Sequence, residues 1–176
     1  METTMNIKQQ KWFDRKFDFG PNQPPFASIV ERLRGTPARL EEKIVNVSRE
    51  MLAAKPEGAW SAQENAGHLG DLEPLWQGRL QDILSGMKHL READLTNKKT
   101  NEAGHNAKDP VALVRQFRTM REQTIFLLEA LHPHELEQSS LHPRLLTPMR
   151  IGDLFLFVAE HDDHHLSKIT ELLNPR

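Results

Sequence analysis

The spacing of apolar residues is the feature that most constrains the fold of this 176-residue chain. In four long segments, apolar side chains recur every three to four positions, as they do along one face of an amphipathic helix. These segments begin near residues 26, 61, 110 and 151. No segment shows the alternation of apolar and polar residues that marks a half-buried strand, and no internal repeat is visible. The sequence therefore predicts an all-α four-helix bundle, which a chain of this length can form as one domain.

Helix-start signals support two of these segments. Ser61 and Glu64 match a capping box, in which each residue satisfies a backbone N–H of the other at a helix start. Asp109 and Pro110 match an N-cap followed by a proline in the first helical turn. The second helix is expected to end near residues 85–86, and the third near residues 132–133.

Two features interrupt the helical pattern. The triplet Gly35-Thr36-Pro37 predicts a break or kink in the first helix, because a residue that precedes proline disfavours helical backbone. Long polar connections run over residues 90–109 and 133–149. Because short loops suffice to join neighbouring antiparallel helices, connections of this length predict a bundle with long crossovers.

Residues 1–25 are expected to form an N-terminal arm, and residues 26–176 the bundle domain. Prolines in the second half of the arm exclude a regular helix there. Aromatic residues gather in the arm at positions Trp12, Phe13, Phe17 and Phe19. Two interpretations remain open: the arm packs on its own domain, or it packs on a partner subunit.

Composition excludes several classes of function. The formal net charge is −2, which does not suggest binding to nucleic acid or to an anionic membrane. The absence of cysteine excludes disulfides, thiolate nucleophiles and cysteine-based metal sites. It also fits the reducing cytoplasm, and the N-terminal residues lack the apolar segment of a signal peptide. We expect a cytoplasmic protein with no membrane partner.

The segment His161-Asp-Asp-His-His165 lies in the fourth predicted helix. Helical phase places His161 and His165 one turn apart on the apolar face, and it places His68 on or beside the apolar face of the second helix. Two histidines at positions i and i+4 form a natural chelating pair, and a third would leave a metal position open to water or substrate. The alternative is that all three are core histidines satisfied by hydrogen bonds.

The other polar residues near this pair are assigned less specific positions. Asp162 and Asp163 fall off the apolar face, toward solvent or the surroundings of the site, and His164 lies at its border. Four further histidines are expected in turns or on the surface: His89, His132, His134 and His142.

Two motifs resemble those of a known family. The run from Trp60 to Leu69 resembles the pattern W-S-x-x-E-x-x-x-H-L of the DinB-like family, also called YfiT-type metal-dependent hydrolases. The run from His161 to Ile169 resembles that family's H-x-x-H-H-x-x-x-I pattern. The resemblance covers residues 26–173. It implies a four-helix bundle with crossovers, often homodimeric, in which His68, His161 and His165 hold a divalent metal, zinc or nickel.

The resemblance also implies a class of reaction. Some family members are transferases that use bacillithiol, mycothiol or glutathione, and one is a maleylpyruvate isomerase. We therefore expect a metal-dependent enzyme, a thiol S-transferase or a hydrolase, whose partner is a small molecule such as a low-molecular-weight thiol. The alternative is a non-catalytic metal-binding or stress-response interaction protein.

Residues around the predicted site complete the hypothesis. Asp71, one turn from His68, and His164 are candidates to orient a ligand or relay a proton. The polar connection that contains Asn101, His105 and Asn106 is expected to form part of a pocket wall, because long polar loops often carry function.

Overall fold

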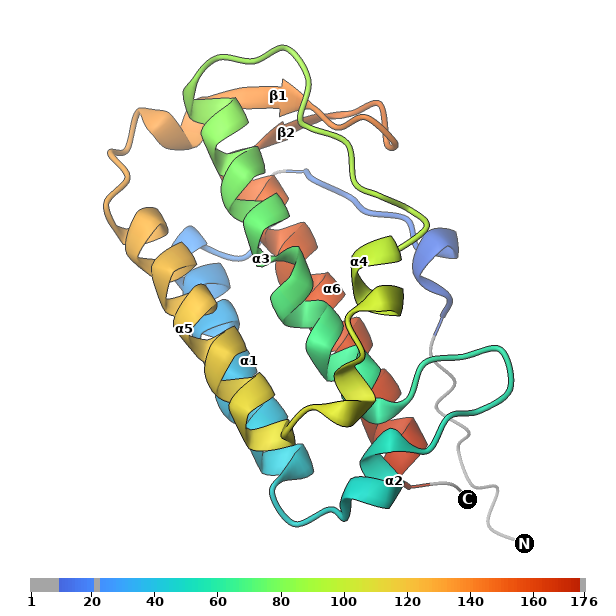
Figure 1. Cartoon of the computed structure of the whole chain (residues 1–176). Helices are drawn as coiled ribbons and strands as arrows, with labels where there is room; N and C mark the ends of the chain where they lie inside the picture. The colour runs from blue at the N-terminus through green and yellow to red at the C-terminus, as the bar shows by residue number, and fades with distance from the viewer. Residues whose placement is uncertain (1–9, 21–22, 175–176) are drawn as a thin grey trace, which may run out of the picture.

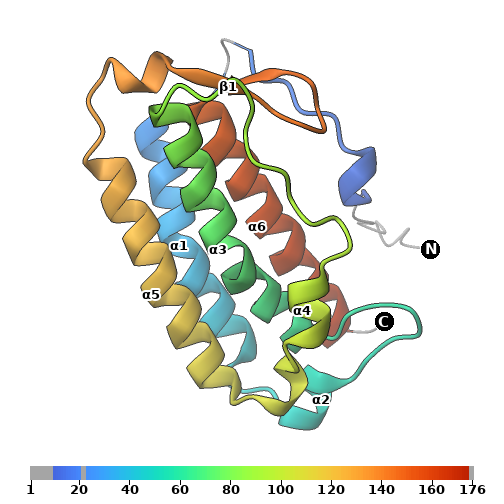
Figure 2. The ribbon, with the colours of Figure 1, turned by 45° about the horizontal axis from the view of Figure 1, so that its top comes forward.

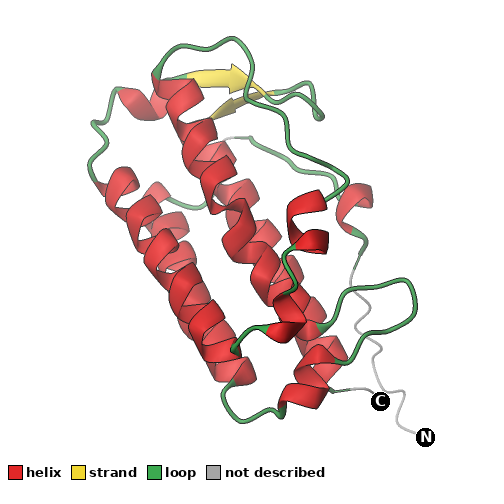
Figure 3. Ribbon diagram, in the orientation of Figure 1, coloured by secondary structure: helices red, strands yellow, loops and turns green. Residues whose placement is uncertain are grey.

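Four long helices lie side by side in the computed structural model, which describes residues 10–20 and 23–174 (Figures 1 and 3). The predicted all-α four-helix bundle is therefore confirmed. Among the described residues, no helix combines the length and the apolar character needed to cross a membrane. The long helices are α1 (Phe26–Ile44), α3 (Ala62–Leu84), α5 (Pro110–Glu129) and α6 (Ile151–Leu173).

The packing of the bundle explains its long connections. Helix α3 packs against α5 and α6, and α1 packs against the same two helices, as Figure 2 shows. The connections from α1 to α3 and from α5 to α6 therefore join helices that are not close neighbours. The crossover predicted over residues 133–149 is thus present. The connection over residues 90–109 instead joins α3 to its neighbour α5, and the other crossover runs from α1 to α3. Short elements interrupt the chain outside the long helices: η1 (Trp12–Asp14), α2 (Arg49–Ala53), α4 (Lys98–Glu102), η2 (His105–Ala107), η3 (Glu135–Glu137), β1 (Ser139–Leu141) and β2 (Pro148–Arg150).

The helix-start signals act as predicted. The backbone N–H of Glu64 donates to the Ser61 hydroxyl at 3.0 Å, and the Glu64 carboxylate accepts from the Ser61 N–H at 2.9 Å. The Asp109 carboxylate accepts from the backbone N–H of Ala112 at 3.2 Å. These caps fix the start of α3 and α5, because they satisfy backbone donors that have no partner inside the helix.

Of the break or kink predicted at Pro37, the break is wrong, since α1 continues through this residue. A proline inside a helix leaves the carbonyl four residues earlier without its N–H partner. Here that carbonyl belongs to Leu33, and it accepts a hydrogen bond of 3.2 Å from Nη1 of Arg121 on α5. A donor from a neighbouring helix thus compensates for the missing bond.

Two short strands form a hairpin that the sequence did not reveal. β1 pairs with β2 in antiparallel register, with Ser140 opposite Met149. Three residues per strand are too few to show an alternating pattern. The turn includes Leu146 in the left-handed region, at φ 53°. Leu141 exchanges backbone hydrogen bonds with Lys88 and Leu90, which ties the hairpin to the segment after α3.

The described part of the arm packs on the bundle. The Trp12 ring lies 5.0 Å from the ring of Phe157 on α6, and the Phe17 ring lies 4.9 Å from the same ring. Phe19 also packs against the core, whereas Phe13 is 59% exposed. The first interpretation of the arm thus holds for Trp12, Phe17 and Phe19. Arm residues 1–9 and 21–22 lie outside the described residues.

A buried ion network lies between the helices. Arg121 on α5 pairs with Glu73 on α3 and with Asp162 on α6, each at 2.5 Å. Asp162 also accepts a hydrogen bond of 2.8 Å from the Thr36 hydroxyl on α1. The assignment of Asp162 to solvent or to the surroundings of the site is wrong. Because α6 packs against α1 and α3, its buried arc is wider than one apolar stripe.

Removal of the Arg121 guanidinium is expected to destabilise the bundle strongly. Arg121→Met leaves two buried carboxylates without a cation, and we expect the free energy of unfolding to fall by about 3 to 5 kcal/mol. Urea denaturation of wild type and variant measures the change. The matched control is Arg118→Met. Arg118 lies one turn before Arg121 on α5, and its replacement removes only an exposed ion pair with Glu41 on α1, so it should change stability little. Equal effects of the two substitutions would contradict the role of the buried network.

Candidate metal centre

Three histidines from two helices meet inside the bundle. His68 comes from α3, and His161 and His165 come from successive turns of α6. All three side chains are buried, and one ring nitrogen of each lies within 4.8 Å of the others. The structure therefore brings together the three residues that the sequence predicts as metal ligands.

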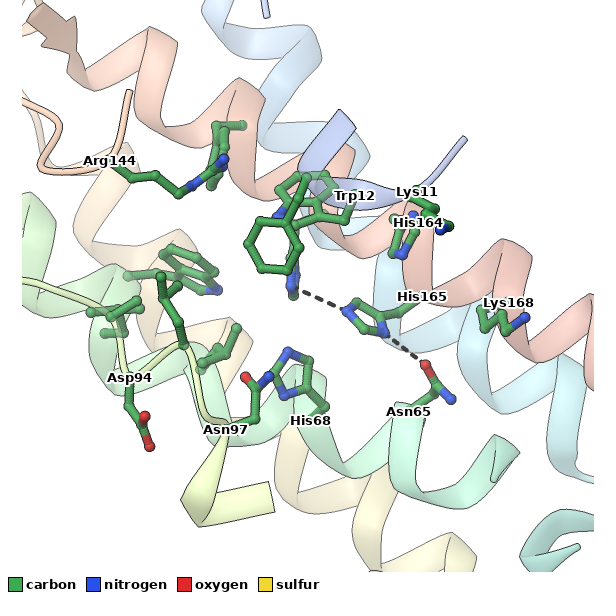
Figure 4. Close-up of a pocket in the computed structure, with 18 of the residues that line it drawn as sticks. Lys11, Trp12, Asn65, His68, Asp94, Asn97, Arg144, His164, His165 and Lys168 are labelled. Carbon is green, nitrogen blue, oxygen red and sulfur yellow. Dashed lines mark hydrogen bonds between the residues drawn. The ribbon is translucent and has the colours of Figure 1, made fainter. Parts of the chain in front are cut away.

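Asn65 fixes the protonation of the His165 ring. Its side-chain amide N–H donates to the backbone carbonyl of Ser61 at 2.8 Å, so its oxygen must face His165. That oxygen lies 2.8 Å from Nδ1 of His165 (Figure 4). Because the oxygen only accepts, Nδ1 carries the proton and the Nε2 lone pair points toward the other two histidines.

A chain of hydrogen bonds orients His68 in the same way. The Thr100 hydroxyl donates to the Asp71 carboxylate at 2.9 Å, so it accepts from Nδ1 of His68, also at 2.9 Å. Asp71 is also bound to Nε2 of His105 at 2.8 Å. Asp71 thus acts on His68 through Thr100, and Nε2 of His68 is left to face the cluster.

His161 completes the group without a comparable support. Its Nε2 lies 3.2 Å from Nε2 of His165. Its Nδ1 is buried with no hydrogen-bond partner among the described residues. The ring is held by aromatic contacts instead, with Trp12 at 5.1 Å and Trp76 at 5.7 Å between centroids.

Burial keeps the three rings neutral. Desolvation lowers the pKa of His68 from 6.5 to about 4, against the opposing effect of Asp71. Desolvation also lowers the pKa of His161 and of His165 well below the usual range, and the neighbouring histidines lower both further. Neutral imidazoles with their lone pairs directed at one point are suitable ligands for a divalent transition metal. The residues present therefore fit a bound metal ion.

The cluster forms part of the wall of a large cavity. The cavity has a volume of about 970 Å³, and its lining includes all three histidines. Trp12 and Trp60 cover the cluster, and the Trp60 ring lies 4.7 Å from that of His68. Three protein ligands beside an open cavity leave room for a water or a substrate, as in catalytic rather than structural metal sites.

The structure separates the residues that were predicted around the site. His164 is half-buried and lines the cavity, with its ring 5.2 Å from that of His165. Asp71 lies behind His68. The polar connection that contains Asn101, His105 and Asn106 forms part of the cavity wall, as predicted. The lining residues are 92–95 and Asn97, in an earlier part of the connection, and the three residues named above do not line the cavity.

His105 explains a glycine beside the candidate ligand. A Cβ at Gly67 would lie only 2.4 Å from the His105 ring, so any larger residue would displace His105 from Asp71. His142 lies in the turn of the hairpin, one of the two places expected for it, but it is buried, with 3% of its surface exposed. His89, His132 and His134 are exposed, as expected.

Sequence reasoning missed Asn65, Thr100 and Trp12 as parts of the site. Asn65 lies three residues before His68 and therefore near the same helix face, a signal that could have indicated it. Thr100 and Trp12 lie in segments without helical periodicity, and only the tertiary structure places them beside the histidines.

Thr100 gives a test of the support for His68. Thr100→Val removes the acceptor for Nδ1 of His68 but keeps the volume of the side chain. We expect the affinity for Zn²⁺ to fall about 10- to 100-fold, measured by competition with a chromophoric chelator. Thr100→Ser retains the hydroxyl and should bind Zn²⁺ nearly as well as wild type. An unchanged affinity in Thr100→Val would show that this hydrogen bond does not orient a ligand.

The lowered histidine pKa values predict how the stability of the metal-free protein depends on pH. Between pH 6.5 and about 4 the unfolded chain binds protons that the folded His68 does not. The free energy of unfolding should therefore be highest above pH 6.5 and should decrease as the pH falls through this range. Urea denaturation of chelator-treated protein measures it, and His68→Gln should show a smaller decrease. A stability that rises as the pH falls would contradict the prediction.

Comparisons with known proteins agree with this geometry. The structure of YfiT from Bacillus subtilis, described as a probable metal-dependent hydrolase with an unusual four-helix bundle topology, matches with a TM-score of 0.73 and 20% sequence identity. The match covers 90% of this chain and 91% of that one and shows a shared fold. A search of curated protein sequences finds no match. The family model described as DinB superfamily matches residues 19–169, and the chain therefore belongs to the DinB superfamily.

Proposed function

We propose that this protein is a metal-dependent enzyme that acts on a small molecule. The observation that carries the proposal is the three-histidine cluster at the wall of a cavity of about 970 Å³. A cavity of this size is large enough for a small-molecule substrate. Zinc or nickel is the proposed ion, since neutral imidazole nitrogens suit both metals.

The bound ion would lower the pKa of a water or thiol in the open position and polarise a substrate group. The side chains of the protein orient the metal ligands and exclude water. Asn65 and Thr100 hold His165 and His68 in the orientation that directs each Nε2 toward the cluster. Trp12 and Trp60 exclude water from one side of the cluster.

His164 is the proposed proton acceptor in the cavity. Desolvation, Arg15 and Lys168 lower the pKa of its imidazole, so the ring is neutral at neutral pH. The ring lines the cavity next to His165, where it can accept a proton from a water or thiol. This position supports a role in proton transfer for His164. Asp71 accepts from the Thr100 hydroxyl that holds His68, which supports a positioning role for Asp71.

Two reactions are compatible with this site. Hydrolysis is supported by the similarity in fold to YfiT, which is described as a probable metal-dependent hydrolase. Transfer of a thiol to an electrophile is supported by the volume of the cavity, which has room for two small substrates. The chain has no cysteine, so the attacking sulfur would come from a low-molecular-weight thiol cosubstrate.

A non-catalytic metal-binding or stress-response protein is the alternative function. A structural zinc site is normally closed by four protein ligands. Here the three histidines face a cavity, and this openness favours the enzyme.

Metal content tests the proposal directly. Protein purified without a metal-affinity column is analysed for transition metals before and after incubation with Zn²⁺ or Ni²⁺. We expect about one equivalent in wild type and loss of binding in His161→Gln, while circular dichroism shows that the helices persist. His134→Gln, which changes an exposed histidine outside the site, is the control. Less than about a tenth of an equivalent in wild type after loading would refute the metal site.

Activity assays then separate the two reactions. Metal-loaded protein is incubated with cellular thiols and a generic electrophile, and in parallel with ester and amide substrates. Metal-dependent consumption of thiol supports the transferase, and metal-dependent cleavage without thiol supports the hydrolase. If a loaded protein accelerates neither reaction, the non-catalytic alternative gains support.

A further inference from the structure

A second polar group lies in the same cavity as the three histidines. It consists of Arg79 on α3 and of His142 and Arg144, which follow β1 in the turn of the hairpin. Figure 4 shows Arg144 on the opposite side of the pocket from Asn65 and Lys168. None of these three residues belongs to the candidate metal centre.

The environment of His142 leaves two hydrogen-bond donors facing each other. Its Nδ1 accepts from the backbone N–H groups of Arg144 and Leu145, at 3.2 and 3.1 Å, so the proton of the ring must lie on Nε2. Nη1 of Arg79 lies 3.1 Å from that Nε2. A guanidinium nitrogen only donates, so both atoms need an acceptor that neither can supply to the other.

The two arginines also lack acidic partners. Within the described residues, neither Arg79 nor Arg144 forms an ion pair, and Nη2 of Arg144 is buried with no hydrogen-bond partner. Nε of Arg79 donates to the backbone carbonyl of Arg91 at 3.1 Å. The nearby carboxylate of Asp82 is already bound by Arg91, through its backbone N–H at 2.8 Å and its guanidinium at 2.7 and 2.9 Å.

Burial and the neighbouring positive charges lower the pKa values of Arg79 and His142. Desolvation lowers the pKa of Arg79 to about 10, with Asp82 opposing the change and Arg144 adding to it. Desolvation likewise lowers the pKa of His142 to about 4, and both arginines lower it further. A buried cation without a partner is costly, so an anion that accepts hydrogen bonds here would be bound favourably.

Aromatic side chains connect this group with the histidine cluster. The Arg79 guanidinium lies 5.5 Å from the ring centroid of Trp76, and the same ring lies 5.7 Å from that of His161. Phe157 lies beside His142 on the same wall, at 5.5 Å between centroids. A small molecule that spans about one indole ring can therefore touch both polar groups across an apolar wall.

We propose that Arg79, His142 and Arg144 bind an oxyanion, a carboxylate or a phosphate, at one end of the substrate. The reacting group at the other end lies at the three histidines, and this part of the inference rests on the proposed function. The substrate class is then a small anionic molecule with an apolar middle. Arg79 donates to the anion from α3, and His142 and Arg144 donate from the turn of the hairpin.

Anion titrations test the subsite. Inorganic phosphate and, in parallel, acetate are titrated into the full-length protein by calorimetry, with and without bound Zn²⁺. We expect saturable binding of at least one anion to the metal-free protein, weakened about tenfold in Arg144→Gln by loss of a charge-assisted hydrogen bond. Tighter binding of phosphate or of acetate tells which oxyanion the substrate carries.

The choice of variants keeps the test interpretable. Arg144 is half-buried in a turn, so its replacement should leave the bundle folded, whereas replacement of the buried Arg79 alone could unfold it. Arg118→Gln removes the same charge from a residue that does not line the cavity and should leave anion affinity unchanged.

The possible failures are distinguishable. The inference is overturned if neither anion binds metal-free protein, if binding requires Zn²⁺, or if Arg144→Gln and Arg118→Gln bind equally well. Any of these results together with normal Zn²⁺ binding leaves the proposed metal centre intact. Conversely, anion binding that depends on Arg144 in a protein that never binds metal supports the subsite and refutes the metal-dependent function.

Discussion

The guanidinium of Arg121 on α5 is buried in the bundle and contacts the other three long helices. From α5 it reaches Glu73 on α3, Asp162 on α6 and the carbonyl of Leu33 on α1. A buried ion group of this kind tolerates little displacement, because each charge depends on its partners in a medium of low polarity. Successive residues of a helix point about 100° apart. With Asp162 held toward Arg121, His161 and His165 are turned toward α3, where they meet His68.

The cavity combines apolar walls with polar groups at two places. The histidine cluster is supported from behind by Asn65 and by the series Thr100, Asp71 and His105. Arg79, His142 and Arg144 carry hydrogen-bond donors that find no acceptor among the described residues. Aromatic rings form the wall between these residues and the histidine cluster. Such a cavity selects a ligand by the distance between its polar ends as well as by its volume.

Much of the fold was predictable because its signals are local. The caps at Ser61 and Asp109 and the apolar periodicity defined the start of α3 and α5. The error at Pro37 has a non-local cause, because the compensating donor comes from Arg121, 84 positions later in the numbering. The strands β1 and β2 escaped prediction because three residues carry no period. The burial of Asp162 and of His142 was not predicted, because each side chain is covered by elements from distant parts of the chain.

The sequence by itself determined the helical class and the placement of His68, His161 and His165 on the apolar faces of two helices, because helical periodicity alone assigns these features. It also carried the two motifs that identify the superfamily. Only the tertiary structure decided which atoms support the histidines and where the cavity lies. It also decided that Arg79, His142 and Arg144 line one cavity with donors that have no acceptor in the part of the chain that the structure describes. These features depend on contacts between segments far apart in the sequence, and the order of residues in any one segment does not specify them.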